Sequence, residues 1–139
     1  MRKYSAVTST AILSLVVLFW LAGYGSGSQG GGPTEVRVTL SEYKVVLDKS
    51  SIPAGPVKFI IRNAGTAVHE VVLEPAGDVD KPFEVNGKES EVENIGPGQS
   101  ATLEWTIDKP GQYQLACHIE GPRDHYAAGM VMTFAVTAR

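Results

Sequence analysis

From Thr34 onward, the chain consists of short runs in which apolar and polar residues alternate, and each run ends at a turn that contains glycine or proline. The run Glu35–Leu40 (EVRVTL) alternates strictly. Successive side chains of a β-strand point to opposite faces, so this period of two predicts a half-buried strand. The same pattern, less strict in places, predicts strands within residues 56–63, 68–74, 101–107, 109–117 and 130–138.

These runs predict an all-β domain over residues 34–139. About seven to eight strands separated by turns are typical of an antiparallel β-sandwich with Greek-key connections. The polar stretch 75–93 is expected to form a loop with room for one helical turn. Because no segment has the pattern of an amphipathic helix of useful length, the sequence argues against helical fold classes.

The N-terminal residues 1–22 have the features of an export signal. Arg2 and Lys3 precede the apolar run Ala11–Ala22 (AILSLVVLFWLA), which has the length of a signal-peptide core rather than of a membrane span. No charged residue occurs between Tyr4 and Thr34, so an uncleaved membrane anchor is the alternative. Both interpretations place the folded domain outside the cytoplasm, in the periplasm or attached to the outer side of the membrane.

Residues 23–33 are predicted to form a flexible linker, because they are rich in glycine and serine and offer nothing to bury. The preceding stretch Leu21–Tyr24 resembles a bacterial lipoprotein cleavage box, but Tyr24 stands at the cysteine position. Without a thiol there, lipid attachment has no acceptor.

The charge and cysteine content narrow the function. The net charge is −3 and no basic patch is visible, which argues against nucleic acid as a partner. Cys117 is the only cysteine, so it cannot form a disulfide within the chain. It is therefore a buried apolar residue, a reactive thiol or a metal ligand.

One loop between two apolar runs gathers three soft donors, namely Cys117, His125 and Met130, and His69 lies far upstream. Blue-copper sites use two histidines, one cysteine and a weak axial methionine, a set that suits both copper oxidation states. Each residue alone has a duller explanation, since free cysteine and methionine are common in cores. Their order and spacing in an exported β-protein favour a single copper ion.

Two neighbours compete for these roles. His118 adjoins Cys117, but adjacent side chains on an extended strand point to opposite sides, so His125 is preferred as the ligand. Met132 is expected to pack in the core, which leaves Met130 for the axial position. A thiol enzyme with Cys117 as nucleophile and His125 as base is disfavoured, because no oxyanion-forming glycine motif or helix N-terminus adjoins Cys117.

The segments CHIEGPRDHYAAGM, PGQYQLA just before it and NAGTAVHEVVL upstream resemble the cupredoxin family, in particular its plastocyanin-like and auracyanin-like bacterial members. The resemblance covers residues 35–139. It implies a β-sandwich that holds one type 1 copper ion, with His69, Cys117 and His125 as ligands and Met130 as the axial ligand. It also implies an electron carrier rather than an enzyme.

The sequence departs from the family pattern at two places. Seven residues separate Cys117 from His125, more than in many members, as if Pro122–Asp124 were inserted. Glu70 follows His69 where many members have asparagine or serine to tie the ligand loops together. That tie is expected to be absent or made differently.

The predicted function is a monomeric electron carrier that docks transiently on redox partner proteins, with membrane attachment possible only through the N-terminal segment. His125 is expected to expose a ring edge as the electron port, with an apolar surround and charged neighbours that bias the choice of partner. The surround consists of Ile119, Pro122, Tyr126, Ala127 and Ala128, and the charged neighbours are Glu120, Arg123 and Asp124. The alternatives are a copper carrier or sensor of the same fold and a sandwich module without metal.

Overall fold

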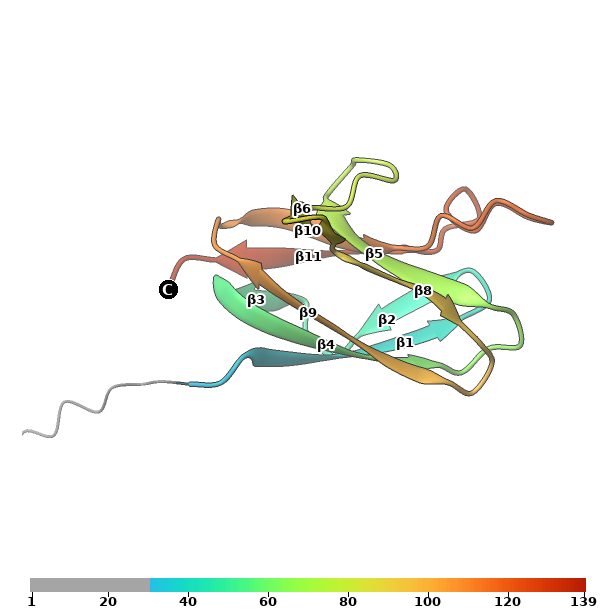
Figure 1. Cartoon of the computed structure of the whole chain (residues 1–139), viewed down its shortest axis with the longest axis horizontal. Coiled ribbons are helices and arrows are strands. Elements are labelled where there is room, and N and C mark those ends of the chain that lie inside the picture. Colours follow the sequence, from blue (N-terminus) through green and yellow to red (C-terminus); the bar gives the residue numbers. More distant parts are fainter. Residues whose placement is uncertain (1–30) are drawn as a thin grey trace, which may run out of the picture. The chain divides into compact units, whose positions relative to one another are not determined.

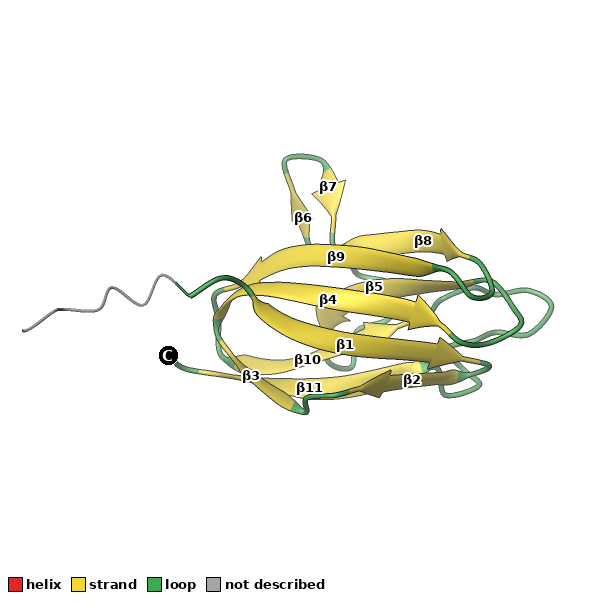
Figure 2. Ribbon diagram, turned by 90° about the horizontal axis from the view of Figure 1, so that it is seen from below, coloured by secondary structure: helices red, strands yellow, loops and turns green. Residues whose placement is uncertain are grey.

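The computed structural model describes residues 31–139, and these form a two-layered β-sandwich (Figures 1 and 2). The predicted signal segment 1–22 and the linker as far as residue 30 lie outside the described residues. Strands and loops account for every described residue, and no helix capable of crossing a membrane occurs in this part of the chain. The predicted all-β sandwich is therefore confirmed.

The first layer is a four-stranded sheet in the order β2-β1-β4-β9. Its strands are β1 (Thr34–Ser41), β2 (Lys44–Leu47), β4 (Gly55–Asn63) and β9 (Ser100–Ile107). The second layer has five strands in the order β3-β11-β10-β5-β8. They are β3 (Ser51–Pro53), β11 (Val131–Thr137), β10 (Gly111–Ala116), β5 (His69–Pro75) and β8 (Glu91–Ile95).

The sheets are mixed, whereas the sequence predicted antiparallel pairing throughout. β1 pairs with β4 in parallel, and β3 pairs with β11 in parallel. The reason is that the chain leaves the first sheet after β2, contributes β3 to the edge of the second sheet, and returns to the first sheet as β4. Such crossovers between layers are not visible in the alternation of side chains, which reports faces and not neighbours.

The core lies between the two layers and comes from the alternating positions. Val36, Val38 and Leu40 of β1 are buried while the residues between them are exposed. Phe59 of β4 is fully buried and packs edge-on against Phe134 of β11, with ring centroids 5.8 Å apart. This arrangement is the one that the period of two predicts.

The stretch 75–93 is more ordered than predicted. It contains the hairpin strands β6 (Glu84–Val85) and β7 (Lys88–Glu89) and most of β8, and it has no helical turn. The hairpin turns at Asn86 and Gly87, both with positive φ (53° and 76°). Asn-Gly is the strongest short hairpin signal, so the sequence did contain the information. Figure 2 shows this hairpin projecting from the sandwich.

One end of the sandwich collects the segments that bear the predicted ligands. β4 ends and β5 begins there, joined by residues 64–68. β10 ends and β11 begins at the same end, joined by residues 117–130. In Figure 1 this end lies on the right, opposite the C-terminus.

Candidate metal centre

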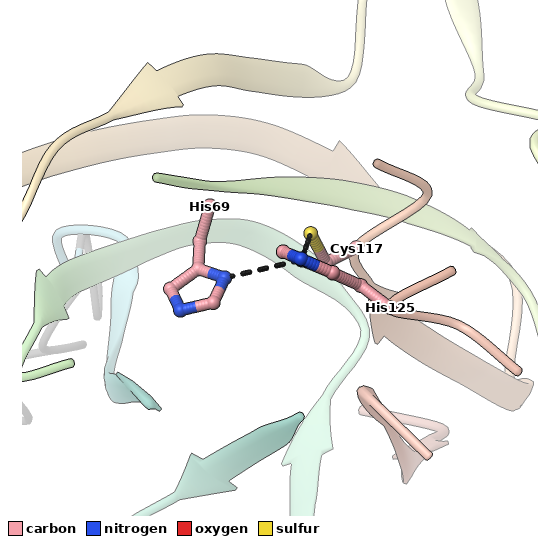
Figure 3. Close-up of side chains that lie close together, drawn as sticks. All are labelled: His69, Cys117 and His125. Carbon is pink, nitrogen blue, oxygen red and sulfur yellow. Dashed lines mark hydrogen bonds between the residues drawn. The ribbon is translucent and has the colours of Figure 1, made fainter. Parts of the chain in front are cut away.

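Three of the four predicted residues meet at this end of the sandwich. His69 is the first residue of β5, Cys117 directly follows β10, and His125 lies in the loop before β11. Nδ1 of His125 is 3.3 Å from Nδ1 of His69 and 3.3 Å from Sγ of Cys117 (Figure 3). One donor atom from each of the three residues falls within 4.8 Å of the others, and all three residues are buried.

Met130 lies beside these residues through its backbone. Its carbonyl accepts a hydrogen bond from the Cys117 amide (3.0 Å), and its amide donates to the His125 carbonyl (2.9 Å). Its side chain is fully buried, whereas Met132 is 37% exposed. The expectation that Met132 packs in the core is therefore wrong, and a buried thioether at this end comes from Met130.

The loop between Cys117 and Met130 is fixed by its own hydrogen bonds. The His125 amide donates to the Ile119 carbonyl (3.0 Å), which turns the chain back toward Cys117. Asp124 then caps the following turn, because its carboxylate accepts from the Ala127 amide (2.8 Å) and its carbonyl from the Ala128 amide (3.1 Å). The longer loop therefore still delivers His125 to the cluster.

His118 faces away from the cluster, as the strand geometry predicted, but it is not a surface group. Its Nε2 lies 2.9 Å from Oε1 of Glu74, and its side chain is largely buried. The ring stacks on Tyr126 with centroids 4.7 Å apart. The buried Glu74 also accepts hydrogen bonds from Gln114 and from the Lys81 amide (2.8 Å each). Sequence reasoning missed this polar network.

The tie between the ligand loops is made by Glu70 itself. Its Oε1 accepts a hydrogen bond of 2.7 Å from the amide of His118. This bond joins the residue after His69 to the residue after Cys117. Glu70 thus connects the two ligand segments, which is the function for which many family members use asparagine or serine.

The turn that presents His69 is fixed by Asn63, which is fully buried. Its side-chain amide donates to the carbonyls of Ala67 and Ile95 (2.8 Å each). Its side-chain oxygen accepts from the Gly65 amide (2.8 Å). The side chain thereby joins the 64–68 segment to the end of β8.

We expect Asn63→Ala to lower the free energy of unfolding of the metal-free protein by about 2–3 kcal/mol, because it leaves buried carbonyls without donors. Chemical denaturation monitored by tryptophan fluorescence measures this change. Gln112→Ala is the control, since Gln112 is an exposed amide side chain. A loss no larger than that of the control would show that the turn does not depend on Asn63.

Burial sets the protonation of the donors before any metal binds. Burial raises the pKa of the Cys117 thiol above its usual value. Burial, together with the nearby His125, lowers the pKa of His69. The metal-free site therefore holds a neutral imidazole and a protonated thiol at neutral pH, and binding of a metal releases the thiol proton.

The donor set fits copper. Two imidazole nitrogens and a thiol sulfur converge in a buried position, and the buried Met130 is hydrogen-bonded through its backbone to Cys117 and His125. Soft sulfur donors combined with imidazole suit copper, whereas magnesium and calcium prefer oxygen. His69, Cys117 and His125 are thus arranged as a possible single copper site.

An aromatic and cationic cover over His125 was not foreseen. Tyr43, in the β1–β2 turn, packs edge-on against the His125 ring with centroids 5.2 Å apart. The Arg123 guanidinium lies over the Tyr43 ring, 4.4 Å from its centroid. Only 4% of His125 is exposed, which is less than the predicted emerging ring edge implies. Arg123 belongs to the apparent insertion, so the longer loop supplies part of this cover.

Solved structures with the same fold include two auracyanins. The structure resembles that of dithionite-reduced auracyanin from the photosynthetic bacterium Roseiflexus castenholzii, with 23% sequence identity, a TM-score of 0.58, and coverage of 77% of this chain and 99% of that one. For auracyanin B the identity is 24%, the TM-score 0.61 and the coverage 77% and 91%.

A multicopper oxidase is more distant. It has 17% identity and a TM-score of 0.52, and the match covers 75% of this chain but only 42% of that one. Identities this low show the common fold alone.

Among curated proteins, none matches the chain. The family model described as "Cupredoxin-like domain" matches residues 11–131, which is most of the sequence. The chain therefore belongs to the cupredoxin-like family.

Proposed function

We propose that the protein is a type 1 copper protein that carries single electrons between redox proteins outside the cytoplasm. His69, Cys117 and His125 would bind the copper ion through their ring nitrogens and the thiolate, and Met130 would supply a weaker fourth ligand. The observation that carries this proposal is the convergence of two imidazoles and the only thiol at one buried position. Bound by such a donor set, copper supplies a one-electron redox couple.

The chain's own residues keep the site rigid and dry. His69 begins β5, and the Cys117 amide donates a hydrogen bond to the carbonyl of Met130, the residue before β11. The Glu70 and Asn63 side chains tie the surrounding segments together. A site held in this way rearranges little when its charge changes, which favours rapid electron transfer over catalysis. We therefore propose a carrier rather than an enzyme.

The surface around His125 is proposed as the docking face. Pro122 and Ala127 are exposed there, and Ile119, Tyr126 and Ala128 are half-buried. A small apolar surface favours brief contacts, while Arg123 and Asp124 select the partner by charge. The N-terminal segment is proposed to direct export, and to anchor the protein if it is not cleaved.

The experiment that tests the proposal is reversible redox titration of the copper-loaded protein in the presence of a copper chelator. An electron carrier should lose its colour on reduction, regain it on oxidation, and retain its metal through repeated cycles. A copper carrier or sensor should instead release its metal to the chelator. A module without metal should hold no copper after purification.

We expect Ala127→Lys to slow electron self-exchange between oxidised and reduced copies at least several-fold, because two docking faces would then bring like charges together. Line broadening in NMR spectra of mixed oxidation states measures the rate. Thr106→Lys, on an exposed position of β9 at the opposite end of the sandwich, is the matched control. If both variants exchange electrons at the same rate, the docking face is elsewhere.

A further inference from the structure

A carboxylate approaches the far side of His69. Glu42 directly follows β1 in the turn to β2, and its Oε1 lies 3.8 Å from Nε2 of His69. Nδ1, on the other side of the ring, faces His125. The His69 imidazole therefore lies between the metal cluster and an acidic side chain that sequence reasoning did not connect with it.

The Glu42 carboxylate is held in place by the turn that precedes His69. It accepts hydrogen bonds from the amides of Thr66 and Ala67 and from the Thr66 hydroxyl. Gly65 makes this approach possible, since a Cβ atom at Gly65 would lie 2.5 Å from Oε1 of Glu42. The carboxylate is therefore fixed in position although its side chain is partly exposed.

These same hydrogen bonds keep the carboxylate negative. The amides of Ala67 and Thr66 lower the pKa of Glu42 to about 2. At neutral pH the His69 ring thus has a fixed negative charge beside its Nε2 edge.

His69 Nε2 is a buried polar atom that lacks a conventional partner. Within residues 31–139, it is the one buried side-chain nitrogen or oxygen atom that has no hydrogen-bond partner. A metal-binding histidine nearly always directs its second ring N–H toward a carboxylate, a carbonyl or water, which fixes the tautomer. At 3.8 Å the Glu42 carboxylate is beyond hydrogen-bond length, so it acts on the N–H group through its charge.

We propose that Glu42 is a positioning residue for His69. The Glu42 carboxylate keeps the proton of the His69 ring on Nε2 and so presents the Nδ1 lone pair to the metal. This proposal rests on the proposed copper site, where the negative charge of Glu42 stabilises oxidised copper more than reduced copper. The nitrogen of His69 that is free to bind the metal is thereby determined by a residue of the β1–β2 turn, and not only by the strand that carries His69.

The first test needs no metal. Imidazole-nitrogen NMR shifts of the metal-free protein report which nitrogen of His69 carries the proton. The wild-type protein should have the Nε2–H tautomer, and Glu42→Gln should increase the Nδ1–H population at least several-fold. Glu35→Gln, at the opposite end of β1, is the control for the lost charge and should leave the tautomer unchanged.

A structural role would give a different pattern. Asn63→Ala loosens the same turn but keeps the carboxylate. It should therefore shift the tautomer population of His69 much less than Glu42→Gln does. Glu42→Asp keeps the charge on a shorter side chain and should restore most of the wild-type tautomer population. A His69 tautomer that is the same in wild type and Glu42→Gln, or an equal shift in Asn63→Ala, would overturn the inference.

The second test uses copper. Chelator competition should show about a 10–100-fold loss of Cu(II) affinity in Glu42→Gln, the range typical for the loss of such an outer partner. The loss of Cu(I) affinity should be smaller. A tenfold difference between the two losses corresponds to a rise in reduction potential of about 59 mV for one electron.

The two tests separate the possible failures. A wild-type protein that holds no copper contradicts the proposed function, while the NMR comparison still decides whether Glu42 directs the tautomer. A copper-loaded protein in which Glu42→Gln matches Glu35→Gln in both affinities contradicts the role of Glu42 alone.

Discussion

Replacement of Cys117 by serine should abolish the intense visible absorption of the oxidised, copper-loaded protein. The colour of a blue-copper site arises from the copper–thiolate bond, and a serine hydroxyl does not replace a soft, readily deprotonated sulfur. The β-sandwich should remain folded, because serine is nearly the same size as cysteine and Cys117 is one residue of a large core. Visible absorption and far-ultraviolet circular dichroism measure the two effects.

The matched control for this variant is Met132→Leu. Met132 carries a sulfur close in sequence to the site, but its side chain is exposed. It should retain the full absorption of the wild-type protein. Colour that persists in Cys117→Ser would show that the thiol is not a copper ligand. Colour lost in Met132→Leu would show that Met132, and not Met130, contributes to the copper site.

Glu74→Ala should produce the largest loss of stability outside the apolar core. Glu74 is fully buried, and its carboxylate accepts hydrogen bonds from Gln114 Nε2 and from the Lys81 amide (2.8 Å each), while His118 Nε2 lies 2.9 Å from its Oε1. Removal of one partner from a buried polar network leaves the others unsatisfied. We expect the free energy of unfolding to fall by about 3–5 kcal/mol.

Denaturation of the metal-free protein by urea measures this loss without any contribution from copper. Glu104→Ala is the control, because Glu104 is exposed and pairs with Lys58 at the surface (3.2 Å). Such surface pairs contribute at most about 1 kcal/mol. If Glu74→Ala unfolds at the same urea concentration as Glu104→Ala, the network does not stabilise the sandwich.

The alternation of side chains predicted the sandwich because burial on one face is a local property of each strand. The six predicted runs, such as Glu35–Leu40 and 130–138, correspond to β1, β4, β5, β9, β10 and β11. The short strands β2 and β3 and the parallel pairs were missed. The position of β3 and the parallel pairs depend on where the chain crosses between layers, which no local pattern records, whereas β2 pairs with β1 across a local two-residue turn.

The candidate site was predictable to the extent that its residues carry unusual chemistry. The order of a lone cysteine, two histidines and a methionine along the chain predicts that these residues form one metal site. The groups around them carry no such signal. Glu42, Tyr43 and Glu74 look like ordinary polar residues of a turn or strand, and only the fold places them beside His69, His125 and His118.

We propose that one copper ion is bound by Cys117 together with His69 and His125. The most direct test is visible and electron paramagnetic resonance spectroscopy of the oxidised full-length chain, combined with metal analysis. We expect one copper ion per chain and an intense visible band that disappears on reduction. Protein that contains no copper, or that binds copper without this band, would contradict it.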